Sequence, residues 1–290
     1  MATVISGSAI AASVRAEVAD GVSDLITRVG RTPGLATILV GADAASRVYV
    51  ASKRKACVAA GMTDHHRELP GSATQDQVSA VIDELAADDR VSGILLQLPL
   101  PDHLDAGALI DRIPAAKDVD GLTMVSAGAL SAGKPGLRPC TPLGVIEILD
   151  QSGVEIGGKR VVVVGRSALV GRPLAQLFVQ RDATVTIAHS RTVDLAAVTR
   201  EAEILVAAAG VPELIGAEHI AEGAVVIDVG IHRTGTGLVG DVDFAAAEIR
   251  ASQITPVPGG VGPMTIAMLL RNTLRAAEAA DQSHIRRTNP

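Results

Sequence analysis

The stretch VVVVGRSALVGRPLAQLF, residues 161–178, decides the fold of half of this chain. Its valines predict a buried strand that ends at Gly165, and Gly171 with Pro173 predicts the first turn of a helix. The free N–H groups at the start of such a helix attract a pyrophosphate. The spacing G-x-x-x-x-x-G departs from the full G-x-G-x-x-G pattern, so a plain strand-to-helix turn remains the alternative.

Similar runs on both sides of this stretch indicate the fold class. Apolar β-type runs alternate with helical patterns, which predicts an α/β protein with largely parallel sheets. The β-branched runs of the second half are typical of strands buried on both faces. The candidate strands are residues 35–41, 91–99, 160–165, 183–188, 203–210 and 223–230, and the candidate helices include residues 46–60, 75–87 and 263–280.

A Pro/Gly-rich segment, SAGKPGLRPCTP at residues 131–142, interrupts this alternation and predicts a domain boundary. A chain of 290 residues is also large for one core. We therefore expect a first α/β domain over residues 1–140 and a Rossmann-type domain over residues 141–270.

The composition argues against some classes of partner and indicates the cellular compartment. The formal charge is −6 without a long basic stripe, which argues against nucleic acid or a membrane surface as partner. No apolar run approaches the roughly 18 residues of a membrane span, and the first residues lack the basic leader of a signal peptide. The two cysteines form neither a disulfide framework nor a zinc spacing, and the seven histidines show no ligand spacing. We expect a cytoplasmic protein without a metal site.

The residues after the second Rossmann strand predict the cofactor. An NAD-preferring fold places an acidic residue here, whereas this chain has Ser190 and Arg191, which suit a 2′-phosphate. The sequence therefore favours NADP over NAD. Arg166 could also reach the phosphates, or it could be a solvated loop cation.

The only tyrosine of the chain, Tyr49, precedes Lys53 by one helical turn, and Ser46 lies on the same predicted face. In a functional interpretation the phenol and the amine flank a pocket, and the pKa of Lys53 is depressed by burial or by a cation, which could be Arg54, Lys55 or a cationic substrate. Otherwise Tyr49 is a core ring and Lys53 a surface cation. The Tyr-x-x-x-Lys pair of short-chain dehydrogenases follows the glycine turn, whereas here it precedes it, so that family is rejected.

Three further segments carry candidate groups. Gln97 follows an apolar strand and would present an amide at its carboxyl end, where ligands bind in α/β proteins. In KDVDG, residues 117–121, Asp118 and Asp120 could accept paired N–H donors from an aminopyrimidine ring or could simply form a turn. The glycines of residues 258–262 allow the backbone to approach a flat ligand closely.

Six motifs now stand in order: ASRVYVASKRKAC, GILLQLPLP, KDVDG, RPCTPLGV, VVGRSALVGRP and TPVPGGVGPMT. Together they resemble the bifunctional methylenetetrahydrofolate dehydrogenase/methenyltetrahydrofolate cyclohydrolase family, the bacterial FolD family. The resemblance implies an N-terminal catalytic lobe completed by a returning helix at residues 271–290, a Rossmann-type NADP lobe, a cleft between them, and a homodimer.

The resemblance also assigns roles to single residues. It implies that Lys53 is the central catalytic residue, that Tyr49 contacts the folate and orients Lys53, that Gln97 tunes Lys53, and that Asp120 anchors the pterin. The dinucleotide would be held by Gly165, Arg166, Ser167, Ser190 and Ile231, and the 2′-phosphate argument above adds Arg191. The folate would be bound by Ser46, Tyr49, Gln97, Pro99, Asp120, Pro258, Gly259, Gly260, Val261 and Gly262.

The implied activity is oxidation of 5,10-methylenetetrahydrofolate by NADP⁺, followed by hydrolysis of the methenyl product to 10-formyltetrahydrofolate. It would belong to one-carbon metabolism, which feeds purine, histidine and methionine biosynthesis. Three alternatives stay open: a dehydrogenase acting on another small substrate, a catalytically silent NADP- or folate-binding module, and a dehydrogenase that has lost the cyclohydrolase step.

Overall fold

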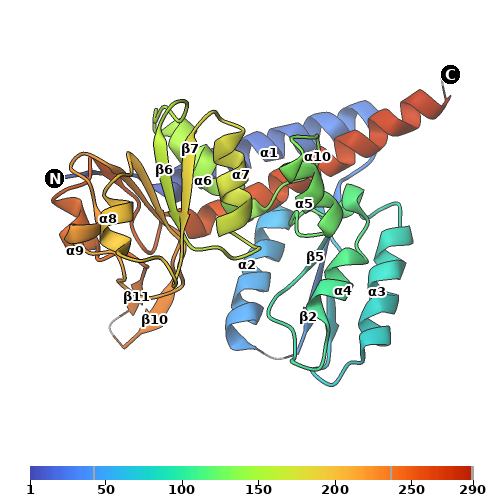
Figure 1. Cartoon of the computed structure of the whole chain (residues 1–290). Helices are drawn as coiled ribbons and strands as arrows, with labels where there is room; N and C mark the ends of the chain where they lie inside the picture. Colours follow the sequence, from blue (N-terminus) through green and yellow to red (C-terminus); the bar gives the residue numbers. More distant parts are fainter. Residues whose placement is uncertain (42, 236, 289–290) are drawn as a thin grey trace. The chain divides into compact units, whose positions relative to one another are not determined.

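The structure is a computed structural model that describes residues 1–41, 43–235 and 237–288 (Figure 1). It divides into two compact units. The large-sheet unit comprises residues 1–12 and 141–265, and the small-sheet unit comprises residues 13–140 and the chain from Ile266 onwards. Each unit has its own parallel sheet, which confirms the α/β class.

The large-sheet unit is built on a six-stranded sheet in the order β1-β12-β9-β8-β6-β7, counted over the described residues. All of its strand pairs are parallel. The strands β6, β8 and β9 in the middle are almost wholly buried, as their β-branched sequences predict. The strands are β1 (Thr3–Val4), β6 (Arg160–Val164), β7 (Thr184–Ala188), β8 (Ile204–Ala207), β9 (Val225–Asp228) and β12 (Gln253–Ile254).

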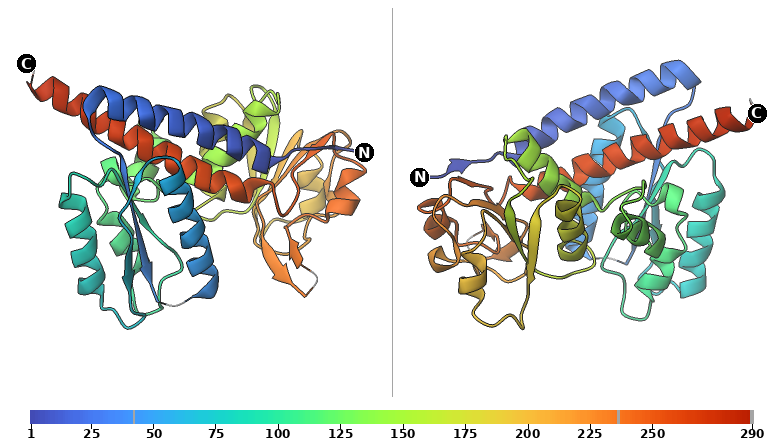
Figure 2. Two further views of the ribbon diagram at one scale, coloured as in Figure 1. Left: turned by 180° about the vertical axis from the view of Figure 1, so that it is seen from behind. Right: turned by 45° about the horizontal axis from the view of Figure 1, so that its top comes forward.

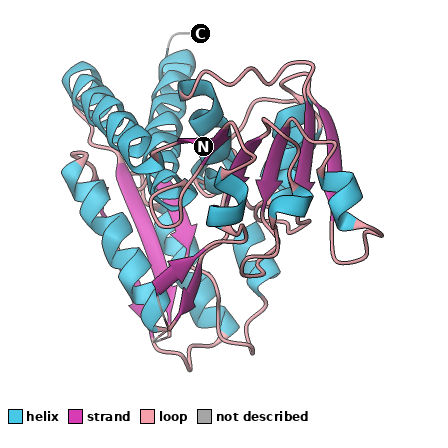
Figure 3. Cartoon of the chain, turned by 90° about the vertical axis from the view of Figure 1, so that its left-hand side faces the viewer, coloured by secondary structure: helices cyan, strands magenta, loops and turns pink. Residues whose placement is uncertain are grey.

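Helices accompany the strands of this sheet, shown in cyan beside magenta in Figure 3. Side chains from β6, β8 and β9 form one apolar core with side chains from residues 195–198 and 244–247. The remaining elements of this unit are α6 (Cys140–Gln151), α7 (Gly171–Val179), α8 (Leu195–Thr199), η2 (Ala217–His219), the antiparallel hairpin β10 (His232–Thr234) and β11 (Gly237–Val239), and α9 (Phe244–Glu248).

The strand β7 differs from expectation. Among the described residues it lies at the edge of the sheet and pairs with β6 alone, so most of its residues are exposed rather than buried on both faces. Ile187, for example, is 40% exposed. A run of β-branched residues predicts a strand, but whether that strand lies in the middle or at the edge of the sheet depends on the topology of the whole sheet.

The division into units also differs from the expected boundary at the N-terminus. Thr3 and Val4 pair in parallel with Gln253 and Ile254, so the first residues add a strand to the large sheet. The N–H of Ala2 also donates to the carbonyl of Glu248. Residues 1–12 therefore belong with the Rossmann-type unit, and not with residues 13–140 as the sequence predicted.

The small-sheet unit has β2 at the centre of a four-stranded parallel sheet. Both views of Figure 2 and Figure 1 place β2 and β5 between α2 and α3. One core cluster of this unit is made of Ala, Val, Leu and Ile side chains from β2, β5 and α3 and from residues 104–113. The elements are β2 (Gly34–Val40), α2 (Ala44–Ala59), β3 (Thr63–Asp64), β4 (Arg67–Leu69), α3 (Gln75–Ala87), β5 (Gly93–Leu96), α4 (Ala106–Asp111), η1 (Ala115–Lys117) and α5 (Met124–Ser131).

Local sequence signals set the start of α3. The hydroxyl of Thr74 accepts the N–H of Gln77 at 3.3 Å, and the Gln77 amide oxygen accepts the N–H of Thr74 at 2.9 Å. This reciprocal cap satisfies two of the free donors at a helix N-terminus. The helix consequently begins at Gln75, as predicted.

Two long helices, α1 (Gly7–Val29) and α10 (Val261–Thr288), lie side by side in Figure 2. Gly21 leaves room for Leu274, because a Cβ at Gly21 would lie 2.7 Å from its side chain. Arg271 also pairs with Glu17 at 3.2 Å. Within the described part of the chain, no helix is long and apolar enough to cross a membrane.

Candidate active site

The helix α2 presents one buried face to the small sheet. Ser46, Val50, Lys53 and Cys57 recur every three or four residues on that face, and all four are buried. The Asp43 carboxylate caps the helix by accepting the N–H of Ser46 at 2.7 Å. The helix therefore directs a lysine toward the protein interior.

Lys53 is 4% exposed, and Gln97 and Tyr49 both lie close to its ammonium group. Its Nζ donates to Oε1 of Gln97 at 3.0 Å and lies 4.5 Å from the centre of the Tyr49 ring. The latter distance is within the range of a cation–π interaction. The alternative of a solvated Lys53 on the protein surface is wrong.

Gln97 follows β5 and is held in one orientation. Its backbone N–H donates to the carbonyl of Ile38, and its side-chain Nε2 donates to the carbonyl of Leu98. With Nε2 engaged in this way, Oε1 is the atom that faces Lys53. The amide therefore acts as an acceptor toward the amine.

Burial lowers the pKa of Lys53, and the negative charge of Asp120 and the nearby Cys140 oppose this shift. The neighbouring cations are not the cause, because Arg54 is exposed and pairs with Asp64 at 2.7 Å. Burial also raises the pKa of Asp120, and Lys53 opposes that shift. The two groups thus stabilise each other's charged form in a poorly solvated site.

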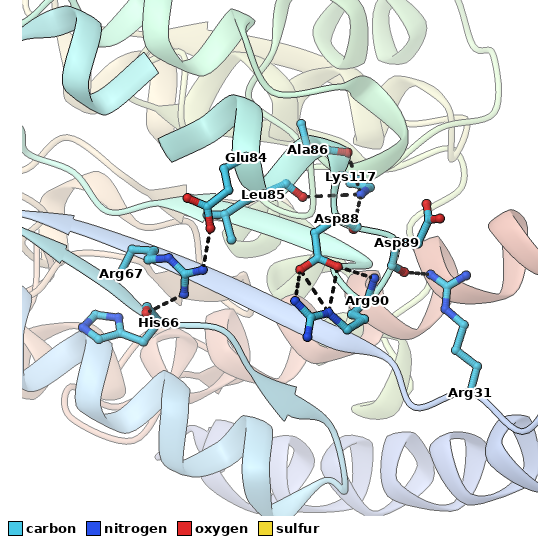
Figure 4. A network of polar contacts seen from close by, with 10 residues as sticks. All are labelled: Arg31, His66, Arg67, Glu84, Leu85, Ala86, Asp88, Asp89, Arg90 and Lys117. Atoms are coloured by element: carbon cyan, nitrogen blue, oxygen red, sulfur yellow. Dashed lines mark hydrogen bonds and ion pairs between the residues drawn. The ribbon is translucent and has the colours of Figure 1, made fainter. Parts of the chain in front are cut away.

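The loop that carries Asp120 is tied to its surroundings on both sides. Before it, the ammonium of Lys117 donates to three carbonyls at the end of α3, at 3.5 Å to Leu85, 2.8 Å to Ala86 and 2.9 Å to Asp88 (Figure 4). A cation at a helix C-terminus satisfies free carbonyls and complements the helix dipole. Lys117 therefore fixes where this loop begins.

Asp118 and Val119 hold the middle of the loop. The Asp118 carboxylate is 1% exposed and accepts the N–H of Thr123 and the hydroxyl of Ser126, at the start of α5. Val119 packs over β5, where a Cβ at Gly93 would lie 2.3 Å from its side chain. Asp118 is thus structural, which leaves Asp120 as the carboxylate that faces Lys53.

Two residues of this site carried no assigned role in the sequence. The Cys140 thiol donates to the carbonyl of Val119 at 3.2 Å, and the neighbouring charge of Asp120 helps burial to raise its pKa. Asn272 of α10 donates to the carbonyls of Val119 and Arg138 at 2.8 and 2.9 Å. Cys140 lies in the RPCTP motif, which could have indicated it, whereas no local pattern marks Asn272.

The glycine turn after β6 requires its glycines. Gly165 has φ of +133°, and a Cβ there would lie 2.0 Å from the carbonyl oxygen of Ala208. A Cβ at Gly171 would lie 2.1 Å from the carbonyl oxygen of Gly165. The Ser167 hydroxyl accepts the N–H groups of Val170 and Gly171, which orders the start of α7. The turn can therefore admit a pyrophosphate close to the backbone.

The other expected dinucleotide positions lie at the same edge of the large sheet. Ser190 and Arg191 follow β7 and are exposed, with the Arg191 N–H bonded to Nδ1 of His189 at 3.1 Å. Ile231 follows β9 and is 61% exposed. Arg166 is exposed beside Gly165. Their side chains are accessible to a ligand at the carboxyl ends of the strands.

The glycine segment 258–262 belongs to the large-sheet unit. It is packed against the start of α1: the Gly259 carbonyl accepts the N–H of Ser8 at 2.9 Å, and a Cβ at Gly7 would lie 1.9 Å from the Gly260 oxygen. This segment is therefore in a different unit from Tyr49, Lys53, Gln97 and Asp120, which all belong to the small-sheet unit.

A Rossmann-type unit with a glycine turn and a second α/β unit with a buried lysine define a two-domain, dinucleotide-dependent enzyme. Comparison with known families identifies which one. Residues 5–120 match the tetrahydrofolate dehydrogenase/cyclohydrolase catalytic domain, and residues 139–281 match the NAD(P)-binding domain of the same family. The chain belongs to the tetrahydrofolate dehydrogenase/cyclohydrolase family, as the six motifs predicted.

Individual proteins that are similar to this chain belong to the same family. The bifunctional protein FolD 2 of Frankia alni is 62% identical over 96% of this chain and 97% of its own length. The bifunctional FolD structure of Campylobacter jejuni is 42% identical, with a TM-score of 0.94 over 97% of this chain and 100% of that chain. The Trypanosoma brucei FolD structure, a complex with NADP and an inhibitor, is 44% identical, with a TM-score of 0.92 over 96% of this chain and 98% of that one.

Proposed function

We propose that this chain oxidises 5,10-methylenetetrahydrofolate with NADP⁺ and hydrolyses the methenyl product to 10-formyltetrahydrofolate, as a bifunctional enzyme of one-carbon metabolism. Family membership over nearly the whole chain supports both activities. The observation that carries the proposal is the buried Lys53 hydrogen-bonded to Gln97 beside Asp120. A binding module needs no lysine with a lowered pKa.

The residues of the large-sheet unit fit a dinucleotide. The Gly165 turn leaves space at the backbone, and the Ser167 hydroxyl, which accepts two N–H groups, keeps its own proton to donate to a phosphate. We assign the 2′-phosphate to Ser190 and Arg191, and the rest of the dinucleotide to Arg166 and Ile231. NADP⁺ supplies the hydride acceptor, and the protein's task in that step is alignment.

The second step is the work of Lys53. Its neutral amine takes a proton from water as the water oxygen bonds to the methenyl carbon. It returns that proton to N5 as the carbon–N5 bond breaks, and the remaining hydroxyl proton leaves to solvent as the formyl group forms. Gln97 holds the amine in place by accepting one of its N–H groups.

The remaining contacts to the folate are assigned by position. Asp120 can accept two N–H donors from the pterin, and Tyr49 can stack on it. We place Ser46 and Pro99 beside them, in the same unit. The segment Pro258–Gly262 is proposed to contribute backbone contacts to the folate.

One absorbance assay tests the proposal. The chain is mixed with 5,10-methylenetetrahydrofolate and either NADP⁺ or NAD⁺, and the methenyl product is followed as it forms and decays. Formation with slow, uncatalysed decay would mean a dehydrogenase without cyclohydrolase activity. No formation with either cofactor would refute the dehydrogenase assignment.

We also propose that the protein is a cytoplasmic homodimer. Two buried free cysteines suit a reducing compartment. Unpaired strand edges are templates for pairing with another chain. The strand β7 has such an edge, and Ile187 on it is exposed.

A further inference from the structure

Two buried carboxylates lie at the carboxyl ends of β8 and β9, outside the groups assigned so far. Asp241 follows β11 and is 0% exposed. Its Oδ2 accepts the N–H groups of Ala209 at 2.6 Å and Gly210 at 2.8 Å, just after β8. Its Oδ1 accepts from Nε2 of His232 at 2.7 Å, just after β9. One side chain therefore ties together two loops from neighbouring strands.

Asp228, the last residue of β9, completes the arrangement. It is 3% exposed, and its Oδ1 accepts the N–H groups of Gly230 and Asp241, each at 2.9 Å. Its Oδ2 accepts the N–H of Val242 at 3.0 Å. Asp228 thus holds the backbone of Asp241 in place, and every oxygen of both carboxylates has a donor.

Two glycines make room for these carboxylates. A Cβ at Gly240 would lie 1.8 Å from Oδ2 of Asp228, and a Cβ at Gly230 would lie 2.3 Å from Oδ1 of Asp241. No side chain fits at either contact without displacing a carboxylate. The loops are therefore shaped around the two acids.

This arrangement is costly for the fold. Burial, with a contribution from the neighbouring Asp241 charge, raises the pKa of Asp228 to about 6, against the effect of its N–H donors. Charged groups buried side by side destabilise a protein unless each is well hydrogen-bonded. Such a cost is expected where it fixes a functional geometry.

The segment fixed in this way is the one that carries Ile231. The residue before it, Gly230, donates its N–H to Asp228, and the residue after it, His232, donates its ring N–H to Asp241. Because a carboxylate can only accept, the His232 Nε2 carries the proton in this pair. Ile231 is thus held on both sides while its own side chain stays exposed.

We propose that Asp241, with His232, is a positioning residue that sets the loops after β8 and β9 for the dinucleotide. The inference rests on the proposed NADP site at Ile231. Ligands of parallel α/β sheets bind at the carboxyl ends of the strands, where these loops lie. Asp241 touches backbone and His232 rather than the reacting atoms, so its influence passes through the loops.

The decisive variant is Asp241→Asn. An amide keeps the shape but removes the negative charge, so the charge-assisted bonds to His232 and to the N–H groups of Ala209 and Gly210 are weakened. Its NH₂ group must also face either those two N–H groups, which leaves them without an acceptor, or His232, which must then change tautomer to accept. The control is Asp243→Asn, two residues away, where the carboxylate caps α9 by accepting the N–H of Ala246. Asparagine is as good an N-cap as aspartate, so that change is neutral.

Calorimetric NADP⁺ affinity and the kinetics of both reactions give the readouts. For Asp241→Asn we expect the NADP⁺ Kd and KM to rise about tenfold or more, with a smaller change in kcat. Hydrolysis of supplied methenyltetrahydrofolate without NADP⁺ should stay at the wild-type rate. His232→Ala should resemble Asp241→Asn, and His232→Gln, whose amide nitrogen can occupy the Nε2 position, should restore much of the affinity.

Unchanged NADP⁺ affinity in Asp241→Asn would overturn the inference. So would an equal loss of both activities with a lower melting temperature, since that would mark a purely structural role. Measurements on the wild-type protein distinguish a failure of this inference from a failure of the proposed function. NADP⁺ binding without dehydrogenase activity would refute only the proposed function. Absence of NADP⁺ binding would refute both.

Discussion

At the scale of single residues, Lys53 is buried and its amine is hydrogen-bonded to Gln97. These two properties suit it to act as a base in the hydrolysis step. A lysine in water has a pKa near 10.4 and is almost wholly charged at neutral pH. Burial lowers that pKa, so a larger share of the amine is neutral and able to accept a proton. Asp120 limits the shift, because its charge favours the ammonium.

Lys53→Met should abolish the cyclohydrolase while leaving NADP⁺ affinity intact. Methionine keeps the length of the side chain but removes the base, and loss of a positioned base typically lowers a rate by about 10²–10⁴-fold. The measurement is the decay of methenyl absorbance, with NADP⁺ affinity by calorimetry. Lys55→Met, two residues along on the exposed face of α2, is the control. Near-normal hydrolysis in Lys53→Met would exclude Lys53 as the base.

Gln97→Glu should move the pH profile of the cyclohydrolase. In the wild type we expect the rate to rise with pH and level off below the ordinary lysine value of about 10.4, because the pKa of Lys53 is lowered. A carboxylate 3.0 Å from Nζ would favour the charged amine and raise that pKa. The rise should therefore shift to higher pH, and the rate at neutral pH should fall. An unshifted profile would show that another group limits the rate.

Arg191→Ala should lower the selectivity for NADP⁺ over NAD⁺. A hydrogen bond to a charged group contributes about 1.5–3 kcal/mol, which corresponds to a roughly ten- to hundred-fold change in the kcat/KM ratio. Arg191 is exposed, so high salt should weaken the effect. Arg47→Ala, an exposed arginine of α2, is the control. If steady-state kinetics show the same ratio in wild type and variant, the phosphate is recognised elsewhere.

At the scale of elements, the turn between β6 and α7 depends on the absence of a side chain. Gly165 has a positive φ and almost no space for a Cβ, whereas Gly128 in α5 has nothing within 4 Å of that position. Gly165 and Gly128 therefore have different structural roles. The first permits a close approach of backbone segments, and the second is an ordinary helical position.

Gly165→Ala should weaken NADP⁺ binding and lower the melting temperature. Strain at such a backbone position costs on the order of 1–3 kcal/mol, before the clash with the Ala208 carbonyl is counted. Gly128→Ala should be neutral or stabilise the protein slightly, because alanine favours a helix by about 1 kcal/mol over glycine. Thermal unfolding and NADP⁺ calorimetry on both variants test this. Equal behaviour of the two would contradict the role given to the turn.

At the scale of the whole molecule, each unit has a complete sheet and core, but the large sheet ends in an exposed edge. If two copies pair through β7, Ile187→Lys should yield monomers, because a charge on an edge strand opposes pairing. Light scattering after size exclusion gives the mass. Ile249→Lys is the control, since Ile249 is 74% exposed in the same unit but lies away from β7. A dimer that persists in Ile187→Lys would place the contact elsewhere.

The sequence by itself determined what depends on short-range order. The valine run with its glycine turn predicted β6 and α7, and the spacing of Tyr49 and Lys53 placed both on one side of α2, because hydrophobic period and helical geometry are local properties. The order of six motifs indicated the family. The helix predicted to start at Gln75 is confirmed, and Thr74 and Gln77 cap it there.

Only the tertiary structure decided the rest. It placed Asp120 beside Lys53 and bonded Asn272 to Val119, 153 positions away along the chain. Residues 1–12 belong to the large-sheet unit, where Thr3 and Val4 form a strand of the sheet, and β7 lies exposed at the edge of that sheet. The tertiary structure also enclosed Asp241 between loops that follow different strands. These features depend on contacts between segments that are distant in the sequence. Residue preference and periodicity are local properties, so they do not predict which distant segments meet or in which register.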